Sequence, residues 1–301
     1  MSNLQELTKE QQTEILGKPP QPQLYYKFGD YKYNTDSKER VLSGIKRLDE
    51  LTKGFEMGCI TIWTGLTNAG KTTVMTMITK QTIEQGEKVF YFNGEQTKDD
   101  FKNNLYKQTV EKGHIKGKRY KKTEIIDWFV EEDEVDKLDK IYSDTLFVYN
   151  NEMHRTVDFI LQAMEEVRSK YGVRVFFLDN FMQIDTSSSD EYREQKEIME
   201  KLRTFAVNKN VHIHLVCHPK KVDKLNTRIT IYDVLGSSNL VNKAYNVISI
   251  IRTDNLTEDD GEYKRLQKYM ASEGYDISQA SSVLEVLKTK RRKMWFGWIS
   301  L

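Results

Sequence analysis

The sequence predicts an α/β domain in which helices cover both faces of a largely parallel central sheet. Seven short runs are continuously apolar, as strands buried on both faces are. Amphipathic stretches of helical length separate most of these runs, and a glycine-rich loop joins the first run to the first such stretch. Strands and helices in alternation form a doubly wound sheet that binds ligands at the carboxyl ends of its strands.

The boundaries follow from where each pattern starts and stops. Strands are expected at the seven apolar runs 59–65, 89–93, 145–150, 173–179, 211–218, 246–252 and 283–289. Helices are expected at 71–85, 97–112, 155–171 and 190–209.

Residues 1–40 are expected to form a short helix and a linker ahead of a domain at 41–301. Apolar residues recur at roughly helical spacing from Leu4 to Leu16, and Gly17 to Pro20 cannot continue a helix. So few apolar residues cannot stabilise an isolated helix. The helix is therefore expected to dock on its own domain or on a neighbouring subunit.

Two charged stretches, 114–140 and 254–282, look like surface insertions. The first contains a basic cluster from Lys116 to Lys122 and an acidic cluster from Glu131 to Glu134, which is most simply a solvated surface. The second separates two predicted strands and is expected to be a long hairpin excursion.

Composition narrows the class of protein. The 301 residues are 38% hydrophobic, which suffices for one large core. The 46 basic and 45 acidic residues nearly cancel, so any contact with nucleic acid must come from local patches. No apolar run is long enough to span a membrane and the first twenty residues are polar, so a cytoplasmic protein without signal peptide or membrane contact is expected. Cys59 and Cys217 lie in apolar runs, which is typical of buried small side chains.

The glycine-rich loop is a phosphate-binding motif. Residues 65–72 fit G-x-x-x-x-G-K-[ST] without deviation, follow an apolar strand and open a helix. Backbone N–H groups of such a loop converge on phosphates, Lys71 reaches the β- and γ-phosphates, and the Thr72 hydroxyl ligates magnesium. The residues expected to bind ATP, or another nucleoside triphosphate, with Mg²⁺ are Gly65, Asn68, Ala69, Gly70, Lys71, Thr72, Thr73 and Asp179.

Three further side chains are expected near the phosphates because each lies at the end of a predicted strand or just beyond it. Asp179 ends a strand in the Walker B arrangement and is expected to hold magnesium with Thr72, although an ordinary turn residue would look the same. Glu95 is the candidate general base, and the alternative is that it is the N-cap or a first-turn residue of the next helix. His218 can sense the γ-phosphate or simply end a strand.

These residues resemble those of the ring-shaped replicative helicases of the DnaB type, most closely the helicase half of bacteriophage primase-helicases and of the mitochondrial helicase Twinkle. The resemblance covers about residues 41–301 and implies a RecA-like core. Its most selective parts are the block His218–Lys221 and the block Gly236–Ser238, in this order and spacing. The other matching parts are Ser43–Leu51, Gly54–Phe55, Asn93–Glu95, Leu178–Gln183 and Ala244–Ile248.

The resemblance implies roles for the site residues. Glu95 would be the catalytic base, Asp179 the Walker B residue and His218 the γ-phosphate sensor. Loops after His218 would face a central channel and grip single-stranded DNA through Lys220, Lys221, Lys224, Arg228, Gly236 and Ser237.

The end of the chain resembles the family's arginine-finger element, K-x-R-x-G-x-x-G. Lys290 to Gly297 aligns without a gap and places Arg292 at the finger, although Met294 replaces the usual glycine. The neighbouring Arg291, or a plain basic surface hairpin, is the alternative. An arginine supplied in trans implies nucleotide sites at subunit interfaces of a homo-oligomeric ring, expected to be a hexamer.

The front of the chain departs from the family. Primase-helicases carry a zinc module and a primase fold there and DnaB proteins a helical collar, whereas this chain has about forty residues and no Cys-rich zinc motif. Primer synthesis is therefore not expected, and a loader or primase would act in trans. The expected function is an ATP-dependent DNA helicase or single-stranded DNA translocase in replication. The alternative is a RecA-like ATPase that is not a helicase, acting in recombination, regulation or assembly.

Overall fold

The computed structural model describes residues 27–28, 39–119, 124, 126–186, 190–220, 229–234, 238–272, 274, 276–290 and 298–300. The chain divides into two units, 1–37 and 38–301, and the account below concerns the second. The helix expected between Leu4 and Leu16 lies outside the described residues.

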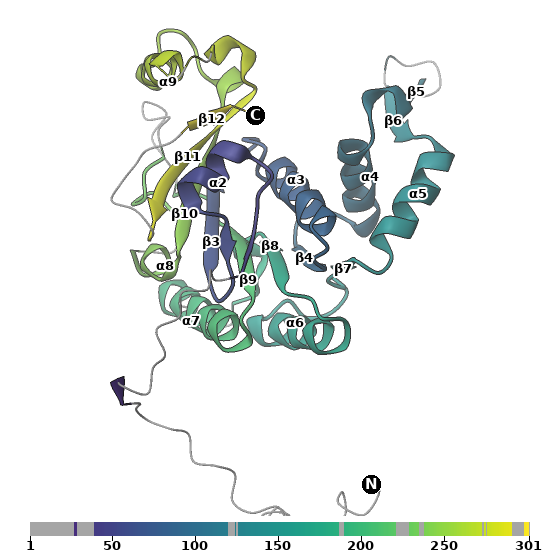
Figure 1. Cartoon of the computed structure of the whole chain (residues 1–301), viewed down its shortest axis with the longest axis vertical. Coiled ribbons are helices and arrows are strands. Elements are labelled where there is room, and N and C mark those ends of the chain that lie inside the picture. The colour runs from purple at the N-terminus through teal and green to yellow at the C-terminus, as the bar shows by residue number, and fades with distance from the viewer. Residues whose placement is uncertain are drawn as a thin grey trace, which may run out of the picture. The chain divides into compact units, whose positions relative to one another are not determined.

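The core of this unit is an eight-stranded sheet with the order β12-β11-β10-β3-β9-β8-β4-β7 (Figure 1). Its strands are β3 (Ile60–Gly65), β4 (Val89–Asn93), β7 (Leu146–Val148), β8 (Val175–Asp179), β9 (His212–Val216), β10 (Asn246–Arg252), β11 (Ser282–Thr289) and β12 (Trp298–Ser300). Six of them, from β10 across to β7, run parallel. β11 is antiparallel to β10, and β12 is antiparallel to β11. The predicted, largely parallel sheet is confirmed.

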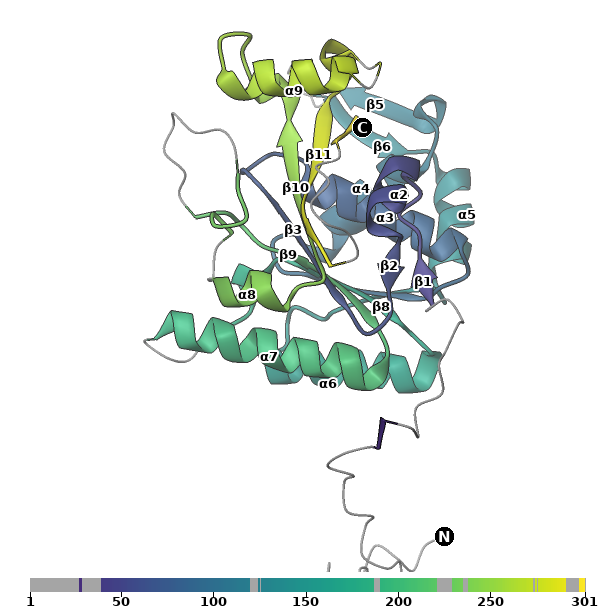
Figure 2. The ribbon, with the colours of Figure 1, turned by 60° about the vertical axis from the view of Figure 1, so that its left-hand side comes forward.

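Helices cover both faces of the sheet, as Figures 1 and 2 show from two directions. One face packs against α2 (Lys46–Thr52), α3 (Lys71–Glu84) and α4 (Lys98–Thr109). The other packs against α6 (Val157–Tyr171), α7 (Glu191–Lys209) and α8 (Ser238–Lys243).

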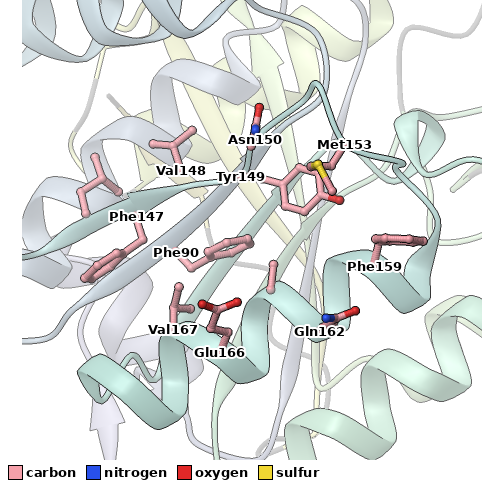
Figure 3. A pocket seen from close by; sticks show the side chains of 12 residues that line it. Phe90, Phe147, Val148, Tyr149, Asn150, Met153, Phe159, Gln162, Glu166 and Val167 are labelled. Atoms are coloured by element: carbon pink, nitrogen blue, oxygen red, sulfur yellow. The ribbon is translucent and has the colours of Figure 1, made fainter.

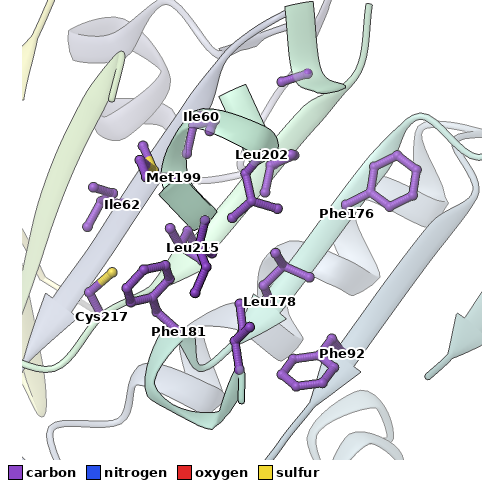
Figure 4. Close-up of a cluster of buried hydrophobic side chains, with 14 of the residues drawn as sticks. Ile60, Ile62, Phe92, Phe176, Leu178, Phe181, Met199, Leu202, Leu215 and Cys217 are labelled. Atoms are coloured by element: carbon purple, nitrogen blue, oxygen red, sulfur yellow. The ribbon is translucent and has the colours of Figure 1, made fainter. Parts of the chain in front are cut away.

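Each central strand contributes to both layers because successive side chains of a strand point to opposite faces. In β3, Ile62 packs towards α7 while Trp63 packs towards α3, and both are fully buried. Figure 4 shows the layer under α7, where Met199 and Leu202 lie against side chains of the sheet such as Leu215. This burial on both faces explains why the strands appear in the sequence as continuous apolar runs.

Local capping sets the helix boundaries. The Thr97 side chain accepts a hydrogen bond from the Asp100 N–H at the start of α4, and Asp190 does the same for the Arg193 N–H at the start of α7. α6 ends at Gly172, whose φ of 76° is in the left-handed region that favours glycine. The four predicted helices are all present, and their observed ends differ from the predicted ends by a few residues at most.

The insertion after α4 is a β-hairpin followed by a helix. Strands β5 (Ile115–Arg119) and β6 (Ile126–Val130) pair antiparallel, and α5 (Glu132–Tyr142) packs back on α4 through Tyr106 and Tyr142. The charged residues of this insertion that the structure describes are largely at the surface, as expected. The sequence did not indicate that β6 would expose three large apolar side chains, Ile126, Trp128 and Phe129.

The second insertion joins β10 to β11 and contains α9 (Gly261–Ser272), flanked by the 3₁₀ turns η4 (Thr253–Asn255) and η5 (Ile277–Gln279). The predicted hairpin excursion is confirmed, since β10 and β11 pair antiparallel. α9 packs on the β10–β11 hairpin through a small hydrophobic cluster in which Leu266 and Met270 lie with Ile251 of β10 and Val283 of β11. Its Arg265 donates hydrogen bonds of 3.4 Å to the fully buried carboxylate of Glu285 in β11.

Among the described residues, no helix is both long and apolar enough to cross a lipid bilayer. A groove of about 540 Å³ lies beside β7 and α6 and is lined by side chains such as Phe90, Tyr149 and Phe159 (Figure 3). None of the predicted nucleotide-site residues lines it.

Candidate nucleotide site

Four neighbouring strands bring the predicted site residues to one edge of the sheet. β3, β4, β8 and β9 run parallel, so their carboxyl ends lie side by side. Asn93 at the end of β4 is in register with Asp179 at the end of β8. Glu95 and His218 each lie two residues beyond the end of a strand.

The loop after β3 has the backbone that a phosphate cradle requires. A Cβ atom on Gly65 would lie 2.6 Å from the carbonyl oxygen of Ile250, so only glycine fits. Gly70, the N-cap of α3, has a φ of 87°, and Asn68 has a φ of 63°. Ala69 is buried and its N–H donates to the Leu66 carbonyl. The loop therefore turns tightly into the N-terminus of α3, where backbone N–H groups and the helix dipole favour an anion.

Lys71 begins α3, and its side chain is buried under the loop. Nζ donates hydrogen bonds to the carbonyl oxygens of Gly65, at 3.0 Å, and Leu66, at 2.9 Å. Burial lowers the pKa of the Lys71 ammonium, while the carboxylates of Asp179 and Glu95 oppose that shift. The three groups therefore share one electrostatic environment.

Asp179 accepts two hydrogen bonds at Oδ2, from the Thr72 hydroxyl at 2.9 Å and from the Tyr91 hydroxyl at 3.1 Å. Burial raises the pKa of the Asp179 carboxyl, and these two hydrogen bonds and Lys71 pull it back. Burial and the neighbouring carboxylate raise the pKa of Tyr91 well above its usual value, so Tyr91 remains a donor. The peptide bond from Asp179 to Asn180 is cis.

The pair Thr72 and Asp179 fits a magnesium ion that accompanies a nucleotide. Among the described residues, no group of three or more His, Cys, Asp and Glu side chains could hold a metal ion. Mg²⁺ in nucleotide sites takes one or two oxygen ligands from the protein and the rest from phosphates and water. A hydroxyl and a carboxylate oxygen 2.9 Å apart supply that donor set.

Glu95, Asn180 and His218 form a polar group at the same edge. The Asn180 side-chain amide donates to Glu95 Oε1 and lies 3.0 Å from His218 Nε2. His218 Nε2 is 3.4 Å from Glu95 Oε1. The Asn93 side chain accepts from the Glu95 N–H, at 3.3 Å. Since α4 begins at Lys98 with Thr97 as its cap, Glu95 lies before the helix rather than in its first turn.

Other predicted residues are placed as follows. Thr73 is exposed in the first turn of α3, and Lys220 is exposed after His218, where its N–H donates to the Asp233 carbonyl. Lys290 follows β11 and is exposed. The remaining predicted positions lie outside the described residues: Lys221, Lys224, Arg228, Gly236, Ser237, Arg291 and Arg292.

Two residues of this site had no predicted role. Tyr91 lies in the apolar run of β4, and nothing in that run distinguishes its hydroxyl from those of other core tyrosines. Asn180 directly follows the Walker B position, and that adjacency was the available signal. Its position between Glu95 and His218 depends on strand order.

The fold and the site together define a P-loop nucleoside triphosphatase with a RecA-like core. Residues 41–295 match the family model of the DnaB-like helicase C-terminal domain. The chain therefore belongs to the DnaB-like helicase C-terminal domain family, and the suggested relationship is confirmed.

Solved structures agree on the fold. A DnaB-like replicative helicase, described together with its interactions with primase, has a TM-score of 0.63 at 14% identity. The match covers 90% of this chain and 62% of that one, so this chain spans less than two thirds of that helicase. A second solved structure, described as an ATPase domain, has a TM-score of 0.63 at 15% identity, with 86% of each chain covered.

Proposed function

We propose that this protein is an ATP-dependent DNA helicase, or single-stranded DNA translocase, that acts in replication as a ring with nucleotide sites at subunit interfaces. One observation carries the proposal: a phosphate loop, a buried Walker B carboxylate and the Glu95–Asn180–His218 group converge on one sheet edge. Residues 41–301 form the motor domain of this proposal, and 1–40 a segment that packs between subunits.

Each side chain has a chemical task in ATP hydrolysis. Lys71 neutralises phosphate charge, and the loop N–H groups orient the phosphates. Magnesium, when bound, adds positive charge that stabilises the leaving phosphate, and Thr72 and Asp179 would hold it. Glu95 accepts the proton of the attacking water. His218 hydrogen-bonds the γ-phosphate and loses that partner after hydrolysis.

Arg292 of one subunit completes the site of the next in this proposal. A cation supplied in trans stabilises the charge that develops on the transferred phosphate, so hydrolysis requires an assembled interface. Lys71→Ala and Arg292→Ala should each abolish turnover of ATP. Mixing the two inactive variants should restore part of the activity, because some interfaces then combine an intact loop with an intact arginine.

The exposed Lys220 and the basic residues that follow it are proposed to grip the DNA backbone. A phosphate contact contributes to affinity irrespective of base sequence and is weakened by salt. Lys220→Ala should lower affinity for single-stranded DNA equally across sequences and reduce the salt slope by about one. Lys140→Ala is the matched control, since that exposed lysine of α5 lies outside the proposed DNA-binding residues.

The deciding measurement is ATP turnover with and without single-stranded DNA, together with unwinding of a forked substrate. A rate that does not respond to DNA would contradict the helicase and favour a RecA-like ATPase with a different ligand. A mass measurement gives a second criterion, because a ring of six subunits is expected and an open filament is not.

A further inference from the structure

We propose that Asn180 is a positioning residue that holds both Glu95 and His218 through one side-chain amide. The inference rests on the proposed function, in which these two residues are the base and the γ-phosphate sensor. It assigns to Asn180 the physical link between the two.

The geometry of the amide supports this link. Asn180 is buried, with 1% of its surface exposed, so water does not compete for its hydrogen bonds. Its Nδ2 donates to Glu95 Oε1 and lies 3.0 Å from His218 Nε2. The three residues come from the ends of β4, β8 and β9, which are neighbours only in the folded sheet.

The orientation of the amide is fixed by its other end. Oδ1 accepts a hydrogen bond of 2.8 Å from the Met182 N–H, which caps the turn η3 (Phe181–Gln183). With Oδ1 used in this way, Nδ2 must point at Glu95 and His218. A primary amide has two N–H hydrogens, and here each has one partner.

This arrangement sets the hydrogen bonding of His218. Because Nδ2 donates, His218 Nε2 accepts and carries no hydrogen, so a neutral ring has its hydrogen on Nδ1. A movement of His218 towards a phosphate would break its hydrogen bond to Asn180. The return movement would form that hydrogen bond again. Asn180 would then shift relative to Glu95, and a displacement of about 1 Å at a base can cost 100-fold in rate.

A purely local role accounts for only one of these three contacts. Capping of η3 uses Oδ1 and leaves the two contacts of Nδ2 unexplained. Two substitutions separate the roles, because Asn180→Ser and Asn180→Thr both keep a hydroxyl oxygen that can cap the Met182 N–H, and both remove the amide group without adding a charge.

The test is steady-state ATP hydrolysis by the full chain, with and without single-stranded DNA. Both variants should lower kcat by about 10- to 100-fold and leave the KM for ATP and the melting temperature close to those of the parent. Asn104→Ser is the matched control, because Asn104 is also an amide donor, to Gln96 at 3.4 Å. It should behave like the parent. A kcat within threefold of the parent in both Asn180 variants would overturn the proposal.

The link to His218 has its own readout. His218→Ala should lower the rate of Asn180→Ser by a smaller factor than it lowers the parent rate, because the part of its effect that runs through Asn180 is already lost. Full multiplication of the two effects would overturn the link. Glu95→Gln separates this inference from the proposed function: if it keeps the parent rate, the base assignment itself fails. If it is inactive while Asn180→Ser is not, only the role of Asn180 fails.

Discussion

The hydroxyl of Thr72 donates a hydrogen bond of 2.9 Å to Oδ2 of Asp179, a residue 107 positions later in the chain. The first residue belongs to α3 and the second ends β8, so the contact exists only because β8 lies in the same parallel sheet as β3. This pair is the part of the site that can hold magnesium, and it leads directly to the first prediction.

Thr72→Ala should lower magnesium-dependent ATP turnover by about 100-fold or more, because it removes a metal ligand and leaves the buried Asp179 with one donor fewer. Thr72→Ser keeps the hydroxyl and should stay within about threefold of the parent. Turnover measured across a magnesium titration checks both. Equal rates for the alanine and serine variants would contradict a metal role for this hydroxyl.

Gly65→Ala should destabilise the domain by about 1–3 kcal/mol, because the new Cβ would lie 2.6 Å from a backbone oxygen that cannot move alone. In a domain of this size, each kcal/mol lowers the melting temperature by roughly 2–4 °C. Gly113→Ala is the control, since a Cβ there meets no atom within 4 Å. Equal melting temperatures for the two variants would show that the loop tolerates the extra atom.

Acid should destabilise the domain through the buried pair His212 and His214. Burial lowers the pKa of His212 to about 4 and that of His214 well below its usual value. Both neutral rings make a buried hydrogen bond: His212 Nδ1 donates to the Glu56 carbonyl at 2.8 Å, and His214 Nδ1 accepts from Trp63 Nε1 at 3.1 Å. A protonated ring at either position would carry a buried positive charge that water does not solvate.

The direction of this pH effect on stability follows from proton uptake by the unfolded chain. Between pH 6.5 and about 4 the unfolded chain binds the protons that folded His212 rejects, so stability falls as the pH falls through this window. At pH 5 the loss from His212 is on the order of 2 kcal/mol relative to pH 7.5. Thermal unfolding at the two pH values measures it. His212→Gln should melt lower at pH 7.5 but lose less on acidification, and an equal acid-induced loss in this variant and in the parent would contradict the role of His212.

Arg265→Met should destabilise the domain by about 3 kcal/mol, because it takes the Arg265 cation away from the fully buried carboxylate of Glu285. Arg193→Met removes an exposed ion pair with Glu197 and should cost less than about 1 kcal/mol. Chemical unfolding compares the two variants. A small effect of Arg265→Met would mean that α9 does not stabilise β11 through this contact.

The sequence predicted most of the fold because its signals are local. The continuous apolar run at β3 reflects burial on both faces, and the pattern ending in Lys71 and Thr72 lies within eight consecutive residues. By contrast, the exposed apolar side chains of β6 could not be predicted, because five residues rich in aromatic and β-branched side chains look the same whether buried or exposed.

By itself the sequence determined the layered α/β class, the phosphate loop and the relationship to DnaB-like helicases, since periodicity and contiguous motifs carry each of these. Only the tertiary structure decided that Tyr91 donates to Asp179 and that the Asn180 amide lies between Glu95 and His218. The reason is physical: strand order in a parallel sheet is set by packing among distant segments, and side chains from the ends of adjacent strands become neighbours only when that order is established.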